Sequence, residues 1–244
     1  TLQQFVLFYQ PKVSLPDGNI IGAEALARWQ HPVDGLLSPA EFIDLIEQSD
    51  AIHNFSRFVI SEAIRQASEW QATAKSIPVS INLSAYNLAD SQIVPYISEQ
   101  LNYYQLPAHL LEIELTESAS MIDIEITQKA FLALRALGVK LSIDDFGTGM
   151  SSFAYLRELD MDYVKIDRSF IAVMLADERS EKLVKGIISM CHSLDSEIIA
   201  EGIETKEQAQ KLVELGCRIG QGYFFGRPSA AKDITDLLMA NAEH

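Results

Sequence analysis

Cysteine is scarce in this chain, and long hydrophobic runs are absent. Cys191 and Cys217 are the only cysteines in 244 residues. Their spacing fits no zinc motif, so we expect two small packed hydrophobes in a protein of the reducing cytoplasm. No apolar run approaches the roughly 20 residues of a membrane-spanning helix, and no signal peptide is visible. Because the chain starts at Thr1 without Met, we expect a piece of a longer protein, and any membrane association would come from its other parts.

Basic residues are also few. The chain has 19 Lys and Arg against 34 Asp and Glu, a formal net charge of −15. Such a surface repels polyanions, which argues against a nucleic-acid polymer as partner. An anionic substrate would need local cations to overcome this field. With 48% hydrophobic and 22% charged residues and no Ser/Gly/Pro-rich linker, residues 1–244 are expected to form a single globular domain.

Strand-like runs alternate with helix-like patterns along the whole chain. Residues 5–15 and 20–29 flank the turn Pro16-Asp17-Gly18-Asn19, and so short a link predicts an antiparallel pair. Ser38-Pro39-Ala40-Glu41 carries the signals of a helix start, and a longer helix follows to about residue 75. Further strands are predicted near 79–83, 111–116, 140–144, 162–167, 197–200 and 217–219, and further helices near 91–104, 127–137, 151–158, 181–194, 205–215 and 231–240.

This alternation predicts an α/β fold with eight strands, seven of them able to run parallel. The length favours a closed (β/α)8 barrel, with an open doubly wound sheet as the alternative. An open sheet would show nearly continuous apolar strands. Here polar residues alternate with apolar ones, as in Ile113 and Leu115 against Glu112 and Glu114. If outer helices cover the apolar face, the polar face points into the barrel.

Acidic and amide side chains recur where the apolar runs end. Taken singly, each such residue most often belongs to a solvated turn or a helix cap. The Asp144-Asp145 pair before Gly147 and Gly149 is a stronger indication of a binding site, because the glycines let a loop bend closely around a ligand. Lys165 lies inside an apolar run and needs a carboxylate or phosphate partner. So many carboxylates at one rim require a cation, which predicts a metal site. The residues at run ends are Glu24, Asn82, Glu114, Glu117, Asp144, Asp145, Glu201 and Glu204.

Seven motifs in a fixed order extend this pattern over nearly the whole chain. They are Glu24-Ala25-Leu26 with Arg28, Asn82-Leu83-Ser84, Glu114-Leu115-Thr116-Glu117, Asp144-Asp145-Phe146-Gly147-Thr148-Gly149, Val164-Lys165-Ile166-Asp167, Glu201-Gly202-Ile203-Glu204 and Gly220-Gln221-Gly222-Tyr223. With them, the chain resembles the EAL domain, the cyclic di-GMP phosphodiesterase family. The resemblance implies a modified (β/α)8 TIM barrel with an antiparallel first strand.

The resemblance also implies site roles, which we state as expectations. One metal would be held by Glu24, Asn82, Glu114 and Asp144, and Asp144 would bridge to a second metal that Asp145 also holds. These hard oxygen donors suit Mg²⁺ or Mn²⁺. Glu201 would act as general base, with Lys165 and Gln221 orienting the water. Substrate contacts are expected from Gln10, Leu26, Arg28, Asp167, Arg227 and Pro228, and anchoring of the loop after Asp145 from Glu117 and Glu204.

The function implied is metal-dependent hydrolysis of one phosphodiester bond of cyclic di-GMP to linear 5′-pGpG, with Ca²⁺ inhibitory. A binding-only module typically lacks ligands, and this chain lacks none. An enolase-like enzyme expects a capping domain, for which 244 residues leave no room. Met150 and Phe153 depart from the usual residues of the loop flank. We further expect the loop 146–151 to regulate activity, and a homodimer to form through residues 152–158.

Overall fold

The strands of this chain close into a barrel. The structure is a computed structural model, and it describes residues 2–49, 51–73, 75–116, 124–147 and 160–241. The strand order is β1-β9-β8-β7-β6-β5-β4-β2-β3, and a further β1–β2 pairing closes the ring of eight strands. The strands are β1 Phe5–Ser14, β2 Ile20–His31, β3 Gly35–Leu37, β4 Val79–Asn82, β5 Leu111–Thr116, β6 Lys140–Phe146, β7 Tyr163–Ile166, β8 Glu197–Ala200 and β9 Ile219–Gln221.

Strand direction confirms the modified barrel and shows that the open-sheet alternative was wrong. β1 is antiparallel to both of its neighbours, β2 and β9. The remaining barrel strands, from β2 through β4 to β9, pair in parallel. β3 was not predicted; it is a short antiparallel extension of β2 outside the ring. Its three residues are too few for a period-two pattern to be visible in the sequence.

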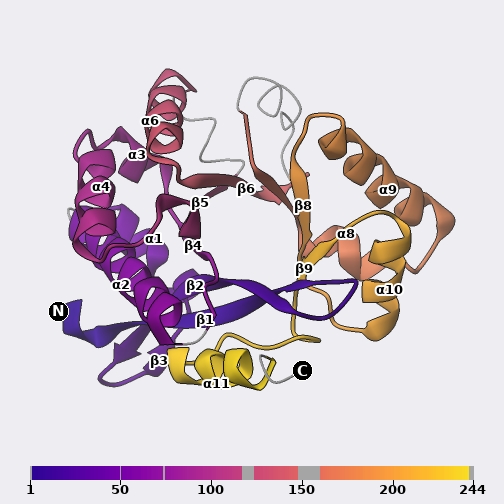
Figure 1. Cartoon of the computed structure of the whole chain (residues 1–244), viewed down its shortest axis with the longest axis horizontal. Helices are drawn as coiled ribbons and strands as arrows, with labels where there is room; N and C mark the ends of the chain where they lie inside the picture. The colour runs from indigo at the N-terminus through magenta and orange to yellow at the C-terminus, as the bar shows by residue number, and fades with distance from the viewer. Residues whose placement is uncertain (1, 50, 74, 117–123, 148–159, 242–244) are drawn as a thin grey trace.

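Helices surround the ring of strands, with α1, α2, α3, α4 and α6 on the left, α8, α9 and α10 on the right and α11 below (Figure 1). Within the described residues, no helix is both long and apolar enough to cross a membrane. Two short helices, α3 and α8, were not predicted, and the predicted helix 151–158 lies outside the described residues. The helices are α1 Ile43–Glu47, α2 Ala51–Thr73, α3 Ala85–Ala89, α4 Ile93–Tyr103, α6 Ile124–Leu137, α8 Arg168–Val173, α9 Glu178–His192, α10 Lys206–Glu214 and α11 Ala231–Asn241, with 3₁₀ turns at Leu2–Gln4, Pro39–Glu41 and Ala108–Leu110.

The two faces of the barrel strands divide as their sequence alternation predicts. Ile113 and Leu115 of β5 are fully buried under the helices, as are Val164 and Ile166 of β7. The opposite face fills the barrel interior with polar side chains. These are Lys12, Ser80, Glu112, Glu114, Ser142 and Lys165, all buried. Parallel strands end at the same rim, so the polar set converges there. Cys191 and Cys217 are free and buried, as expected.

Candidate metal centre and active site

A bulge at the end of β6 turns two successive aspartates toward the barrel mouth. Along a regular strand, Asp144 and Asp145 would point to opposite faces. The pairing of β6 with β7 shifts by one residue between Ile143 and Phe146. Asp145 takes a positive φ of 56°, and its backbone N–H donates to Asp144 Oδ1 at 2.9 Å. Non-glycine residues at positive φ are uncommon and cluster at functional sites, because the surrounding structure must hold them there.

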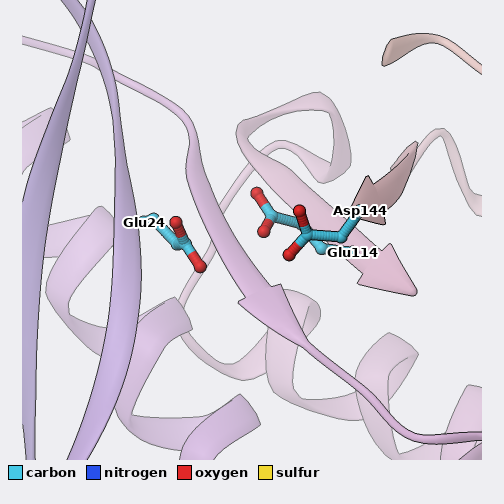
Figure 2. A group of neighbouring side chains, drawn as sticks. All are labelled: Glu24, Glu114 and Asp144. Carbon is cyan, nitrogen blue, oxygen red and sulfur yellow. The ribbon is translucent and has the colours of Figure 1, made fainter. Parts of the chain in front are cut away.

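Two groups of three carboxylates meet at this bulge and share Asp144. Glu24 of β2, Glu114 of β5 and Asp144 each offer one oxygen, and these oxygens lie within 4.8 Å of one another. Figure 2 shows the three carboxylates pointing toward one another from separate strands. Asp144 also forms such a group with Asp145 and Glu201. Three converging hard oxygens fit Mg²⁺ or Mn²⁺, so the donor set can hold metal ions.

Lys165 lies among these carboxylates and is completely buried. Its Nζ is 2.6 Å from Glu114 Oε2 and 2.8 Å from Glu201 Oε1. It is 3.1 Å from Asp144 Oδ2 and 3.4 Å from Glu24 Oε2. The lysine predicted to need a partner therefore has four. One ammonium against four carboxylates leaves the group with excess negative charge, and a second source of positive charge would stabilise it.

Burial and crowding shift the acidities of this group. Burial raises the pKa of Glu201 to about 8, with the Asp144 and Glu24 charges adding to the shift. Burial and the neighbouring Glu114 carboxylate raise the pKa of Glu24, and burial raises that of Asp144. Burial acts in the same direction on Glu114, but Lys12 and Lys165 outweigh it and hold its pKa well below the usual range. Glu114 thus stays ionised, whereas the raised pKa values of Glu24, Asp144 and Glu201 favour their protonated forms.

We expect the melting temperature of the metal-free protein to fall by several degrees between pH 5 and pH 8. The folded pKa of Glu201, about 8, exceeds its ordinary 4.5. Its contribution to stability is therefore fully present below about pH 4.5 and is lost as the pH rises toward 8. Scanning calorimetry in EDTA should show a shallower fall in Glu201→Gln. Glu207→Gln, on the exposed start of α10, is the matched control and should keep the wild-type slope. Equal slopes in all three proteins would contradict the prediction.

Two amides complete the wall of the site. Gln221 Nε2 donates to Glu24 Oε2 at 2.7 Å and to Gln10 Oε1 at 3.0 Å. Gln221 Oε1 is buried and has no hydrogen-bond partner among the described residues. Such an acceptor is costly to bury unless a ligand or water satisfies it. Asn82 lies beside the cluster but donates its Nδ2 to Glu24 Oε1 at 2.8 Å. Its oxygen, the atom that a metal would require, is not the one facing Glu24, so its ligand role stays a prediction.

Close packing of two loops fixes Gln221 relative to Glu201. The Ile203 N–H donates to the Gln221 carbonyl oxygen at 3.1 Å. A Cβ at Gly222 would lie 2.1 Å from the Ile203 carbonyl oxygen. Only glycine allows this approach, because any side chain would push the backbones apart. The loop after β8 and the loop after β9 are therefore held against each other, which explains the glycine between Gln221 and Tyr223.

Two cavities of about 590 and 470 Å³ adjoin the carboxylates. Both are lined by Glu24, Leu26, Asp144 and Asp145. The larger has a mostly apolar wall, which includes Ile43, Ile52, Phe55, Val59 and Leu83. The smaller has a wall that is polar and apolar in equal measure, and it includes Gln10, Asp167, Arg168, Glu201, Glu204 and Tyr223. A ligand that reached the carboxylates could extend into both.

The predicted substrate contacts divide into two sets. Leu26, Gln10 and Asp167 line the cavities. Asp167 also caps α8, because its side chain accepts from the Ser169 backbone N–H at 3.0 Å. Arg28, Arg227 and Pro228 do not line either cavity. The Arg28 guanidinium lies 5.7 Å from the centre of the Phe8 ring, and that of Arg227 lies 4.1 Å from the centre of the Tyr223 ring.

Some predicted roles fall outside the described residues. Glu117 and the loop from Thr148 onward are among them, so loop anchoring and the dimer helix stay predictions. Glu204 is described; its side chain is exposed and lines the smaller cavity. Gly147 has a positive φ of 97°, and a Cβ there would lie 2.8 Å from the Phe170 ring. The start of the loop therefore packs against α8.

Sequence reasoning missed Lys12 and Arg168, and it placed Glu112 on the inward face without giving it a role. Lys12 and Glu112 are buried beneath the carboxylates, and Arg168 lines the smaller cavity. A signal for two of them was present. Lys12 shares a strand face with Gln10, and Glu112 shares one with Glu114. The argument that a buried Lys needs a carboxylate, made for Lys165, applies equally to Lys12.

Comparison with known proteins places this geometry in a family. The EAL domain family model matches residues 1–228. The chain is 42% identical over 236 residues to signaling protein YkoW of Bacillus subtilis and 41% identical over 238 residues to cyclic di-GMP phosphodiesterase NbdA of Pseudomonas aeruginosa, covering 97% of this chain in both cases. The solved PaMucR phosphodiesterase in complex with c-di-GMP matches with a TM-score of 0.89 and 39% identity, over 95% of this chain and 94% of that one. The chain belongs to the EAL domain family.

The chain spans about 30% of the length of YkoW and of NbdA. The match to each is therefore confined to one part of that protein.

Proposed function

We propose that this domain hydrolyses one phosphodiester bond of cyclic di-GMP to give linear 5′-pGpG, with Mg²⁺ or Mn²⁺ as cofactor. The observation that carries the proposal is the pair of carboxylate groups that share Asp144 between two cavities. Cyclic di-GMP has two nucleotide halves joined by two phosphodiesters. A diester placed at the shared carboxylates would leave one half for each cavity. Family membership and the PaMucR complex support the same substrate.

The two carboxylate groups name the residues that would hold the metals. Glu24, Glu114 and Asp144 would hold one ion, and Asp144, Asp145 and Glu201 form the group for the other. Two such ions supply Lewis acidity toward the phosphoryl oxygens and the attacking water. This grouping adds Glu201 to the predicted ligand set. Glu201 can serve as ligand through one oxygen and accept a proton with the other, so its predicted role as general base stays compatible.

The remaining residues position the water and the diester. Gln221 Oε1, buried and without a partner in the described part of the chain, is suited to accept a hydrogen bond from the attacking water. Lys165 Nζ lies 2.8 Å from Glu201 Oε1 and would hold that carboxylate in place as it takes the proton from the water. The proton on the leaving 3′ oxygen would come from solvent. Arg28 is half-buried and always charged, so it would be suited to pair with a substrate phosphate that extends beyond the two cavities.

Hydrolysis should proceed with Mg²⁺ or Mn²⁺ and be at least about tenfold slower with Ca²⁺. Calcium accepts the same oxygens but prefers longer bonds and higher coordination, so it should permit substrate binding and misplace the water. Incubation with cyclic di-GMP, followed by chromatographic separation of 5′-pGpG, measures the rate with each metal. Cyclic di-GMP binding without product under every metal would instead indicate a binding-only module. Equal rates with Ca²⁺ and Mg²⁺ would remove the two-metal argument.

A further inference from the structure

A second buried lysine lies beneath the carboxylate cluster. Lys12 of β1 is 4% exposed and Glu112 of β5 is 3% exposed. The Lys12 Nζ is 3.0 Å from Glu112 Oε1 and 2.8 Å from Glu114 Oε1. Neither Lys12 nor Glu112 lines the two cavities. The pair therefore contacts the proposed metal centre from within the barrel, on the side away from substrate.

Strand register explains how Lys12 reaches Glu114. Gln10 is paired with Glu24, whereas Lys12 is paired with Gly22, two residues earlier on β2. Because β1 runs against its neighbours, Lys12 lies one layer deeper in the barrel than Gln10. Glu112 is likewise two residues before Glu114, about 7 Å deeper along β5. A long lysine side chain from this layer can extend upward to the carboxylate above.

The two lysines hold the two oxygens of Glu114 separately. Lys12 binds Oε1, and Lys165 binds Oε2 at 2.6 Å. Lys165 also contacts Asp144 and Glu24, so Oε2 is the oxygen on the side of the cluster. With Oε1 tied below, the carboxylate plane is fixed and one oxygen faces the predicted metal. Partners of this kind commonly orient metal ligands and tune their affinity.

Stability alone does not explain the pair. Burying two charges costs desolvation energy, and replacing a buried ion pair by apolar groups of similar volume is often neutral or stabilising. The contact to Glu114 gives the Lys12 charge a use that an apolar residue could not supply.

We propose that Lys12 is a positioning residue of the metal centre, which orients Glu114 through its Oε1, and that Glu112 is its second carboxylate partner, which offsets the Lys12 charge. The inference rests on the proposed function for the presence of a metal at Glu114. The inferred role of Lys12 is to raise the affinity for the metal, and it affects turnover only through that affinity.

The test compares Mn²⁺ affinity by isothermal titration calorimetry in the wild type and in the double variant Lys12→Met/Glu112→Gln. The double variant removes one charge of each sign, so the net charge near the metals is unchanged and the fold is expected to survive. We expect its Mn²⁺ affinity to fall by about 10–100-fold. Glu112→Gln alone leaves Lys12 on Glu114 and should lose less affinity than the double variant.

A matched control is Lys140→Met/Asp162→Asn. It removes the 2.6 Å pair between Lys140 Nζ and Asp162 Oδ1, which touches none of the cluster carboxylates. Its Mn²⁺ affinity should equal that of the wild type. Wild-type affinity in Lys12→Met/Glu112→Gln would overturn the proposal and would show that Lys12 only fills space in the barrel interior. An equal loss in Glu112→Gln alone would assign the effect to Glu112 and also overturn it. Absence of hydrolysis in the wild type would refute the proposed function while leaving the affinity comparison valid.

Discussion

Replacing Asp144 by Asn should lower the rate of cyclic di-GMP hydrolysis by more than about 100-fold. Mutating residues that only hydrogen-bond to a metal ligand commonly lowers metal affinity or activity by about 10–100-fold, and Asp144 is itself a predicted ligand. Asp144 is the one carboxylate shared by both groups, so its loss affects both predicted metals. Asparagine keeps the size and one oxygen but removes the charge. The rate with saturating Mn²⁺ and Mn²⁺ affinity by calorimetry measure the effect.

The same change should not unfold the protein. Burial raises the pKa of Asp144, so the ionised carboxylate is held at a cost to stability in the metal-free state. The melting temperature in EDTA at pH 8 should therefore stay equal or rise. Asp236→Asn, an exposed acid on α11, is the matched control and should leave activity, affinity and melting temperature unchanged. A variant with normal turnover per folded molecule and a lowered melting temperature would show that Asp144 only fills the barrel.

Replacing Lys165 by Met should have the largest combined effect on stability and activity. Removing one partner of a buried charge network typically costs about 3–5 kcal/mol, because the remaining charges are left uncompensated. In a domain of this size that corresponds to a fall in melting temperature of about 10 °C. Four carboxylates lose their common cation, so the fall should be larger at pH 8 than at pH 5, where protonation relieves the repulsion. Added Mn²⁺ should recover part of it.

Turnover of the folded Lys165→Met protein should fall far more than its affinity for cyclic di-GMP measured in Ca²⁺. Loss of a group that holds the general base in place for the attacking water lowers kcat without weakening ground-state binding. Lys182→Met is the control, because Lys182 is an exposed lysine paired with Glu178 on α9. An exposed ion pair contributes less than about 1 kcal/mol, so Lys182→Met should leave the melting temperature nearly unchanged. If substrate affinity collapses as far as kcat in Lys165→Met, Lys165 is a substrate ligand instead.

Much of the site was predictable because polar and apolar residues alternate along the barrel strands. In β5 and β7, apolar residues at alternate positions mark the helix-covered face, and the intervening Glu112, Glu114 and Lys165 therefore point inward. The turn between β1 and β2 also required an antiparallel pair. These features depend on neighbours in sequence, so one chain is enough to infer them.

Other features depend on contacts that no local pattern encodes. The alternation rule would send Asp144 and Asp145 to opposite faces, and only the bulge against β7 and the positive φ of Asp145 bring both to the mouth. The predicted roles of Arg28 and Arg227 came from family resemblance, and their positions against Phe8 and Tyr223 were not inferable from spacing.

By itself, the sequence determined the α/β class, the parallel strands, the antiparallel first strand and the polar set at the strand ends. Only the tertiary structure decided that Asp144 belongs to two carboxylate groups, that Lys165 contacts four carboxylates, and that Lys12 supports Glu114 from below. The physical reason is the range of the interactions. Residue types and their period specify which face a side chain takes, whereas the partner of Lys12, 102 residues away, depends on the register with which the barrel closes.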